Sequence, residues 1–331
     1  MRAMVLEDTR PIEDRPLEKA DLPRPKPHGG EILMRVLACG VCHTDLHTVE
    51  GDLDLPRLPL VPGHQVVGRI EENGPDTTRF ALGDRVGVTW FYSSCGVCRF
   101  CSSGRENLCA DARFTGYHVD GGYAEYMVVP EQSAFLIPPV FSDEEATPLL
   151  CGGVIGYRAL QLSEAKPGET LGLYGFGNSA HVVIQVAVKR GCRVHVFTRS
   201  EAHRELAKEL GAVGVGTAKD DPPEPMNSSI VFAPAGPLVL HALKVLDKGG
   251  TLALAGITMT PIPEMDYDLI YGERTVRSVA NTTRRDAEEL LAAAAEIPIR
   301  TVVQSFPLEE ANRVLQMMKA SELRGGAALL I

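Results

Sequence analysis

Long apolar stretches are missing from this 331-residue sequence, which has no run of the roughly 18 apolar residues that a membrane-spanning helix requires. The start, Met1 to Leu6 followed by Glu7 and Asp8, lacks the basic region and apolar core of a signal peptide. Low-complexity tracts, internal repeats and long blocks of like charge are absent too. These absences argue against a membrane partner, and we expect the protein to reside in the cytoplasm.

Positive charge is also scarce. The chain has 33 Lys and Arg against 43 Asp and Glu, so its formal net charge is −10 at pH 7. Nucleic acids and anionic membranes are bound by concentrated basic surfaces, and the charge balance argues against both as partners. The content of 44% hydrophobic and 23% charged residues is ordinary for a globular chain, and the length suggests two domains.

The pattern of apolar residues changes after about Cys151. Before it, Gly- and Pro-rich turns separate short apolar runs, which predicts a β-rich, barrel-like unit. After it, short apolar runs alternate with helical periodicity, which predicts βαβ units and a parallel sheet. Beyond about Asn281, a helix at 286–296, an extended segment at 300–306 and a helix at 308–319 are predicted. Periodicity alone leaves open whether this last part continues the second domain or returns to the first.

The chain contains eight cysteines. In a reducing compartment, a cluster of cysteines indicates metal binding and not a set of disulfides. Four of them follow one another at spacings of three, three and eight residues, close enough to surround one tetrahedral Zn²⁺. With four sulfur ligands no position is open to substrate, so this zinc would be structural. A four-iron cluster and four unligated cysteines are the alternatives, although free thiols there would invite oxidation. The four are Cys95, Cys98, Cys101 and Cys109.

Three further candidate ligands, Cys42, His64 and Cys151, lie far apart in the sequence. Each alone has a structural explanation, as a small buried cysteine or a histidine in a turn. However, Cys42 opens the segment Cys42-His-Thr-Asp-Leu-His47, in which polar groups that can carry protons are unusually dense. Two cysteines and one histidine make a zinc site whose fourth position is free for a substrate oxygen.

These motifs, with Gly63-His64 and Leu150-Cys-Gly-Gly153 through Tyr157, resemble the zinc alcohol dehydrogenases of the medium-chain dehydrogenase/reductase superfamily across essentially the whole chain. The resemblance implies an α/β protein. A GroES-like β-barrel catalytic domain would occupy residues 1–152 and 282–331, and a Rossmann cofactor-binding domain with a doubly wound parallel sheet would occupy residues 153–281. It also implies a homodimer or homotetramer joined through the cofactor domains.

The same resemblance implies that Cys42, His64 and Cys151 hold a catalytic zinc, so that each chain would carry two zinc ions. Zinc lowers the pKa of a bound alcohol. Thr44 would then accept the substrate's hydroxyl proton and pass it through the cofactor ribose to His47.

Further roles are implied for neighbouring residues. Asp45 would orient His64 by a hydrogen bond, and His43 would contact the cofactor pyrophosphate. Trp90 matches a bulky aromatic residue of the substrate pocket, although a simply packed indole is the alternative. Cys39 and Cys192 are expected to be structural.

One position departs from the family pattern. Many relatives have Glu directly after the zinc-ligand histidine, and this chain has Gln65. A neutral amide is a weaker ligand than a carboxylate, so we expect altered electrostatics or exchange kinetics at the zinc, but not loss of the metal.

A dinucleotide-binding motif follows the predicted strand at 171–174. Gly175-Phe-Gly177-Asn178-Ser-Ala180 has the pattern G-x-G-x-x-A before a predicted helix. The first Gly makes the tight turn, the second lets the backbone approach the pyrophosphate, and Ala allows close packing of helix on strand. The helix N-terminus then faces the phosphates.

The end of the next predicted strand indicates the choice of cofactor. NAD-binding folds usually carry Asp or Glu at this position, and this strand ends with Thr198-Arg199-Ser200 instead. An arginine can bind a 2′-phosphate through two hydrogen bonds, so we predict a preference for NADP(H). The alternative is that Arg199 is a solvated residue at the start of a helix and NAD is also accepted.

Together these patterns predict a zinc-dependent alcohol dehydrogenase that transfers hydride reversibly between NAD(P) and a small alcohol or aldehyde, with primary alcohols favoured and secondary or aromatic alcohols as options. A cinnamyl-type aldehyde reductase or a polyol dehydrogenase of the same superfamily is the alternative within enzymes. A zinc-stapled binding protein and a catalytically silent family member are alternatives of another class. A nucleic-acid-binding module would require a basic surface near the quartet, and only Arg99 and Arg105 lie near it in the sequence. A catalytically silent member would be expected to have lost a zinc ligand or Thr44, and none of these is lost.

Overall fold

The computed structural model describes residues 1–256, 259–297 and 299–331, and the chain divides into two units. Unit 1 contains Met1–Cys151, Asn281–Ala295 and Thr301–Ile331. Unit 2 contains Gly152–Ala280 and Glu296–Arg300.

Unit 1 is built on antiparallel strand pairs, except that β16 and β17 are parallel. Its strands are β1 Arg2–Leu6, β2 Leu17–Asp21, β3 Glu31–Val41, β4 Gln65–Asn73, β5 Arg85–Val88, β6 Phe91–Ser93, β7 Arg113–Phe114, β8 Tyr126–Pro130, β9 Ala134–Leu136, β16 Val303–Pro307 and β17 Gly326–Leu330. Its α-helices are α1 His43–Glu50, α2 Asp143–Ala146, α7 Arg284–Glu296 and α8 Ala311–Lys319, and its 3-10 turns are η1 Ile12–Asp14, η2 Cys101–Ser103, η3 Glu106–Leu108, η4 Glu131–Ser133, η5 Thr147–Leu150 and η7 Leu308–Glu310.

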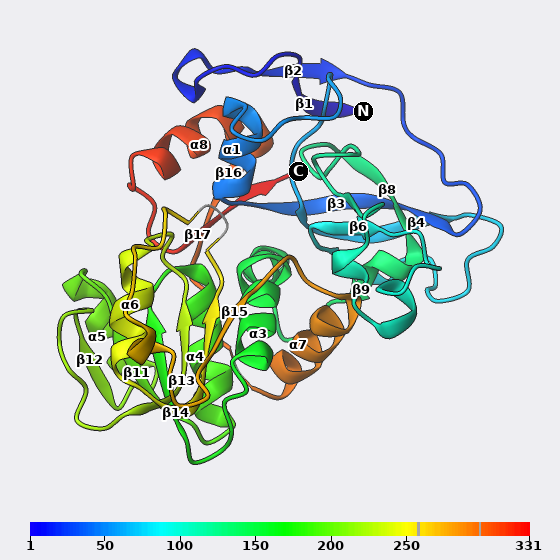
Figure 1. Cartoon of the computed structure of the whole chain (residues 1–331). Coiled ribbons are helices and arrows are strands. Elements are labelled where there is room, and N and C mark those ends of the chain that lie inside the picture. Colours follow the sequence, from blue (N-terminus) through cyan, green and yellow to red (C-terminus); the bar gives the residue numbers. More distant parts are fainter. Residues whose placement is uncertain (257–258, 298) are drawn as a thin grey trace. The chain divides into compact units, whose positions relative to one another are not determined.

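The central strand of unit 1 is β3. It pairs antiparallel with β4, β8 and β17 in a sheet ordered β16-β17-β3-β4-β5-β9, with β8 alongside (Figure 1). Most of its side chains are buried, as expected for a strand covered on both faces. Gly68 of β4 faces the carbonyl of Arg35 so closely that a Cβ would lie 2.3 Å from that oxygen, so only glycine fits there. The predicted β-rich unit is therefore present.

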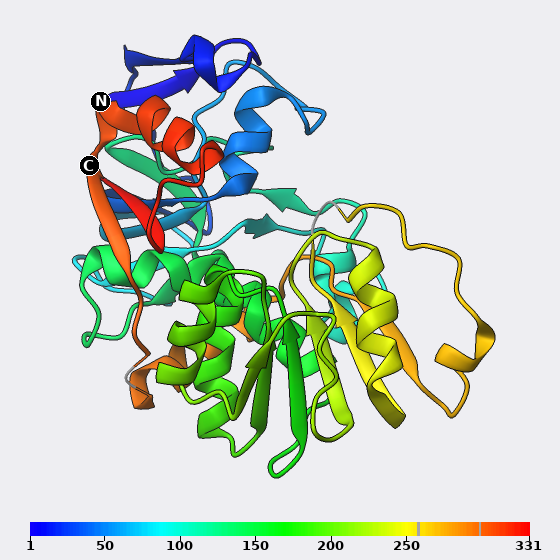
Figure 2. The same cartoon turned by 90° about the vertical axis from the view of Figure 1, so that its left-hand side faces the viewer.

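The C-terminal part of the chain returns to unit 1. Strand β17 pairs with β3, and β16 pairs with β17. Helix α8 lies beside α1 in both views, red against blue (Figures 1 and 2). The apolar residues Leu308, Ala311, Val314 and Leu315 are buried in the same core as α1, and this burial is what recruits the segment.

Unit 2 contains a six-stranded parallel sheet. Its strands are β10 Thr170–Tyr174, β11 Arg193–Phe197, β12 Gly214–Gly216, β13 Met226–Val231, β14 Leu246–Leu254 and β15 Thr275–Ser278, and its helical segments are α3 Gly152–Leu162, α4 Asn178–Lys189, α5 Glu201–Glu209, α6 Pro237–Lys244 and η6 Tyr267–Leu269.

The strands of this sheet follow the order β12-β11-β10-β13-β14-β15, and all neighbours are parallel (Figure 1). This is the doubly wound Rossmann order. Right-handed crossovers that leave the β10–β13 pair in opposite directions place α4 and α6 on opposite faces of the sheet. The loops after β10 and β13 meet where the strand order reverses, which is where such sheets bind nucleotides.

Most predicted elements of the second half agree with the structure to within a few residues, with two informative differences. The predicted helix at 308–319 begins as the 3-10 turn Leu308–Glu310 and becomes α-helical at Ala311. The apolar run at 251–255 also predicts a strand, and in the structure it is part of a longer strand that begins at Leu246, because Leu246 pairs with Met226 of β13. Local periodicity could not predict that pairing.

Candidate metal centres and active site

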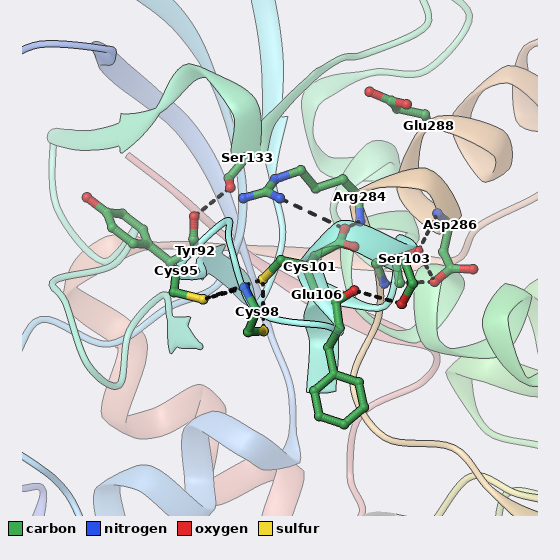
Figure 3. Close-up of polar contacts among 12 residues, drawn as sticks. Tyr92, Cys95, Cys98, Cys101, Ser103, Glu106, Ser133, Arg284, Asp286 and Glu288 are labelled. Atoms are coloured by element: carbon green, nitrogen blue, oxygen red, sulfur yellow. Dashed lines mark hydrogen bonds and ion pairs between the residues drawn. The ribbon is translucent and has the colours of Figure 1, made fainter. Parts of the chain in front are cut away.

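The cysteine quartet forms a separate lobe after β6. The distances between sulfur atoms are 3.5 Å for Cys95–Cys109, 3.6 Å for Cys98–Cys101 and 3.9 Å for Cys95–Cys101. Figure 3 shows Cys95, Cys98 and Cys101 close together. Zn–S bonds of about 2.3 Å in a tetrahedron place sulfur atoms about 3.8 Å apart, so the four thiols fit a zinc ion without rearrangement.

Backbone groups of the lobe favour a thiolate at Cys95. N–H groups of Val97 and Cys98 point at its sulfur, and these hydrogen bonds lower the pKa of the Cys95 thiol to about 7. A thiolate is the form that binds metal.

The second candidate centre brings together three residues from distant parts of unit 1. Cys42 lies at the N-cap of α1, His64 directly precedes β4, and Cys151 follows η5. His64 Nε2 is 3.3 Å from Cys42 Sγ and 3.4 Å from Cys151 Sγ, and the two sulfur atoms are 3.9 Å apart. Tetrahedral zinc places nitrogen and sulfur ligands about 3.6 Å apart, so this donor set also fits zinc and leaves one position open.

Asp45 connects two of these three residues. Its carboxylate accepts a hydrogen bond from the Cys42 backbone N–H at 2.8 Å and lies 3.0 Å from His64 Nδ1. The sequence-based prediction of an Asp45–His64 contact is therefore correct as geometry. Burial alone would lower the pKa of His64, but Asp45 and the Cys42 thiol raise it well above its usual value. With Nδ1 held by Asp45, Nε2 faces the two sulfur atoms.

The other predicted residues of this segment lie on α1. The Thr44 N–H donates to Cys42 Sγ at 3.3 Å, and His47 lies one turn further along the helix. His47 Nδ1 is 2.7 Å from the carboxylate of Asp52, a residue that the sequence reasoning missed. His43 is exposed at the surface of α1, and partial desolvation and the nearby His47 lower the pKa of its imidazole.

An aromatic wall lies against His64. The Trp90 ring contacts the His64 ring edge-on at 5.1 Å between centroids and stacks on Phe114 at 5.2 Å, and Tyr117 lies 5.7 Å from Trp90. We call these three residues, Trp90, Phe114 and Tyr117, the aromatic wall. Phe114 and Tyr117 were not predicted. Their signal in the sequence, the dense aromatic segment 114–118, could have indicated them.

Gln65, the departure from the family pattern, is buried beside His64. Its amide nitrogen has no hydrogen-bond partner in the described part of the chain, and a Cβ at Gly40 would lie 2.9 Å from its oxygen. Cys39 and Cys192 are buried and belong to neither cysteine centre, although Cys39 lies against the loop that carries His64.

The predicted dinucleotide loop lies at the β10 end in unit 2. Gly175 has φ +89°, and a Cβ there would lie 3.0 Å from Ala233, so glycine is required on both counts. Gly177 is the N-cap of α4 and Asn178 its first residue, while Ala180 is fully buried. The helix N-terminus is thus open beside the loop.

Thr198 and Arg199 directly follow β11, the strand beside this loop. The Arg204 guanidinium donates to the carbonyl oxygens of both, at 2.9 and 3.0 Å. Arg204 therefore adds a second positive charge at this strand end, which the sequence reasoning missed because it lies within a helix.

Comparison with known proteins agrees with this geometry. Residues 28–139 match the family described as alcohol dehydrogenase GroES-like domain, and residues 180–296 match that described as zinc-binding dehydrogenase. The probable alcohol dehydrogenase AdhA of Mycobacterium tuberculosis (strain CDC 1551 / Oshkosh) is 46% identical over 97% of this chain and 94% of its own length. An alcohol dehydrogenase of Geobacillus stearothermophilus is 39% identical over 100% of both chains. The crystal structure of an NAD-dependent alcohol dehydrogenase has a TM-score of 0.89 at 28% identity, covering 100% of both chains.

The fold and the site define a medium-chain dehydrogenase/reductase with a GroES-like domain and a Rossmann domain. The chain belongs to the zinc-dependent alcohol dehydrogenases of that superfamily. The predicted enzyme class, an oxidoreductase that uses zinc and a nicotinamide cofactor on alcohols and aldehydes, is confirmed at this level. Within the described residues, no helix has both the length and the apolarity of a membrane span.

Proposed function

We propose that Cys42, His64 and Cys151 hold a catalytic zinc and that the cysteine quartet holds a structural one, which makes two zinc ions per chain. The observation that carries this is the contrast between the two donor sets: four sulfur atoms close around one point, and two sulfur atoms with one nitrogen leave a position free. When bound, zinc supplies a Lewis acid at that position, and the nicotinamide supplies a hydride acceptor for the oxidation of an alcohol.

Residues of α1 would move the proton of the substrate hydroxyl. Thr44 lies in the first turn of α1, and its N–H donates to Cys42 Sγ, so its hydroxyl would accept the proton at the open position. His47 would take the proton onward, with its Nδ1 held by Asp52 and its side chain partly open to solvent. Asp45 would keep His64 in the tautomer that binds metal through Nε2.

Zinc content and activity of two cysteine variants test the assignment. Cys42→Ala is expected to lose one of two zinc ions, measured by mass spectrometry of the metal, together with benzyl alcohol oxidation. Cys39→Ala is the matched control, since Cys39 is buried, precedes Cys42 by three residues in the sequence and belongs to neither centre. If Cys42→Ala kept two zinc ions, the ligand assignment would be wrong.

The proton path has its own test. Thr44→Val is expected to lower kcat about 100-fold or more, which is the usual contribution of general acid–base catalysis, and Thr44→Ser should retain most activity. Both variants should keep two zinc ions. Equal activity of Thr44→Val and the parent enzyme would remove Thr44 from the path.

We infer that Trp90 lines the substrate pocket and that flat, apolar primary alcohols are preferred. The aromatic wall supports this, because it offers ring faces and edges next to His64. A higher kcat/KM for benzyl and cinnamyl alcohols than for sorbitol is expected. The reverse ranking would favour the polyol dehydrogenase alternative.

We propose that NADP(H) is preferred over NAD(H). No carboxylate stands at Thr198-Arg199-Ser200, and Arg204 adds charge at the same place. Bound in the loop of Gly175, Gly177, Asn178 and Ala180, with His43 at the pyrophosphate, the cofactor would present its 2′-phosphate to Arg199.

The ratio of kcat/KM for NADP⁺ to that for NAD⁺ tests this preference. A ratio well above about ten is expected, since one charge-assisted bidentate contact is worth at least a factor of that size. Arg199→Ala should lower the ratio, whereas Arg193→Ala, an exposed arginine paired with Glu224, should not. A ratio below one would refute the proposal and would place this chain with the similar solved structure that is named NAD-dependent.

We propose that the catalytic domain comprises residues 1–152 and 282–331, that the cofactor domain comprises residues 153–281, and that the protein is a cytoplasmic homo-oligomer.

Strand β15 is exposed at the edge of its sheet, and it carries or lies near the exposed residues Tyr267, Tyr271 and Val276, which suits pairing with a second copy. Light scattering should give a multiple of 35.8 kDa, and Val276→Lys should reduce it. A parent protein of 35.8 kDa would refute the oligomer, and cell fractionation tests the location.

A further inference from the structure

One charged side chain from the C-terminal part of the chain reaches the cysteine lobe. Arg284 is the first residue of α7, and its backbone N–H donates to Glu106 Oε1 at 2.9 Å. Its guanidinium Nη1 lies 3.9 Å from the same carboxylate oxygen. The side chains are 25% and 9% exposed, so this pair is largely shielded from water. Figure 3 shows Arg284 extending toward the lobe that carries Cys98, Cys101 and Glu106.

Glu106 connects the cysteine lobe to the N-terminus of α7. It lies in η3, between the third and fourth cysteines of the quartet, so its backbone position depends on the closure of that loop. Its carboxylate accepts the first N–H group of α7, where the helix dipole favours a negative charge. Thr283 and Asp286 satisfy further groups of the same helix start through a reciprocal pair of hydrogen bonds.

On its other side Arg284 contacts the aromatic residues that lead to the active site. Its guanidinium carbon lies 5.0 Å from the centroid of the Phe91 ring. Phe91 pairs with Phe114 across β6 and β7, and the two rings meet edge-on at 6.4 Å. Phe114 stacks on Trp90, which contacts His64. The Arg284 Nε is buried with no hydrogen-bond partner among the described residues, so Glu106 and the Phe91 face are what hold this group.

We propose that Arg284 is a positioning residue that couples the cysteine quartet to the aromatic wall of the active site. Four thiolates around a divalent ion carry a net negative charge, which a nearby guanidinium stabilises. When the quartet is closed by metal, Glu106 holds Arg284 over Phe91, and Phe91 holds Phe114 and Trp90 against His64. Loss of the metal releases Glu106, and the wall then loosens. This inference rests on the proposed roles of the two centres.

The chain offers a direct optical readout, because Trp90 is its single tryptophan. The fluorescence of Trp90 therefore reports the wall alone, without any assay of activity. Arg284→Met removes the charge at similar side-chain length, and Arg284→Lys retains a charge but not the planar fork. The matched control is Arg285→Met, because Arg285 is the adjacent residue, is 83% exposed and pairs with Glu289 within the helix.

Two measurements are made on the full chain. Metal release from the quartet to a chromogenic chelator is followed in a Cys42→Ala background, so that the three-ligand centre does not contribute. Arg284→Met is expected to release zinc about tenfold faster, as befits loss of one charge-assisted contact, with Arg284→Lys in between and Arg285→Met unchanged. In the otherwise unchanged enzyme, Arg284→Met should shift Trp90 emission to the red and raise its quenching by acrylamide.

The kinetic signature separates coupling from general destabilisation. A loosened wall should raise KM for benzyl alcohol several-fold with little change in kcat, and Arg284→Lys should restore part of it. If Arg284→Met does not fold, Glu106→Gln makes the same test by removing the charge while keeping an acceptor for the helix N–H. Unchanged zinc release and unchanged Trp90 emission in the variants that fold would overturn the proposal.

Failure of the proposed function would be distinguishable. A parent enzyme without dehydrogenase activity would refute the function but leave the release rates and the emission of Trp90 as a valid test of coupling. Conversely, an active parent enzyme with variants that match it in both measurements would refute the coupling alone.

Discussion

At the scale of single residues, a carboxylate lies beside the three candidate ligands Cys42, His64 and Cys151 without being one of them. Asp45 is 2% exposed and contacts both the Cys42 backbone and His64. One residue thus fixes the N-terminus of α1 and the orientation of an imidazole ring. Such outer contacts set ligand basicity and ring geometry, so their loss should weaken the metal site more than the fold.

Asp45→Asn is expected to lower zinc affinity at the three-ligand centre about 10–100-fold, the usual cost of losing a carboxylate that orients a ligating histidine. Competition with a chelator of known affinity measures it. The quartet serves as the internal control, because Asp45 does not contact it. Equal affinity for the variant and the parent would mean that the hydrogen bond does not tune this ligand.

A second residue-scale prediction concerns pH. His195 lies in β11 and is buried, and burial lowers the pKa of its imidazole, while Glu224 at 3.8 Å acts in the opposite direction. A histidine with a lowered folded pKa binds protons more readily when unfolded. Its contribution to stability is therefore lost as pH falls through the unfolded value of about 6.5. The free energy of unfolding should fall between pH 7.5 and 5.5, and less so in His195→Gln.

Urea unfolding at those two pH values checks this, with the exposed His241→Gln as the control. If both variants lost as much stability as the parent chain between the two pH values, His195 would not be a source of the acid sensitivity.

At the scale of elements, the loop that carries His64 is held by close contacts between backbones. A Cβ on Gly121 would lie 1.9 Å from the carbonyl oxygen of Gly63, and one on Gly116 would lie 2.8 Å from the Gly63 nitrogen. Gly63 itself has φ +96° and lies on the Tyr123 ring. Both contacts are with backbone atoms of Gly63 and not with a flexible side chain, so a Cβ at Gly121 or Gly116 must displace Gly63, the residue before His64.

Gly121→Ala is therefore expected to destabilise unit 1 by about 1–3 kcal/mol or more through overpacking, and to weaken metal binding at His64. Thermal unfolding and chelator competition measure the two effects. Gly30→Ala is the control, since a Cβ there meets no atom within 4 Å. A Gly121→Ala protein with the stability and zinc affinity of its parent would show that the loop can shift freely.

At the scale of the whole molecule, both candidate metal centres belong to unit 1, and the dinucleotide loop belongs to unit 2. Among the cysteines, Cys192 alone lies in unit 2. Each unit has its own buried core. Zinc and cofactor should therefore stabilise different units, because a ligand stabilises the unit whose folded state binds it.

Calorimetry with and without a strong chelator tests this division. Metal removal is expected to lower the transition of unit 1 and leave that of unit 2, whereas NADP⁺ should raise the transition of unit 2. At about 100 times its Kd, a ligand adds about 2.7 kcal/mol to the stability of the unit that binds it. A single transition that moves equally with chelator and cofactor would show that the units unfold together.

The sequence by itself was sufficient for the enzyme class, the β-rich and parallel-sheet halves, and the membership of both cysteine groups. The two halves and the cysteine quartet depend on short-range information: apolar periodicity, a glycine loop between a strand and a helix, or ligand spacing. The sequence also carried the family resemblance that linked Cys42, His64 and Cys151 across the chain. Their roles as zinc ligands, the preference for NADP(H) and the oligomer stay predictions.

Tertiary structure alone decided the contacts between segments that are remote in sequence. The return of β16, β17 and α8 to the first unit follows from burial against α1, which periodicity does not report. Arg284 and Glu106 are 178 residues apart, and no local pattern could pair them. The same holds for Phe114 against Trp90. Which charges and rings meet is set by how the sheets pair and pack, so these contacts can be read only from the folded chain.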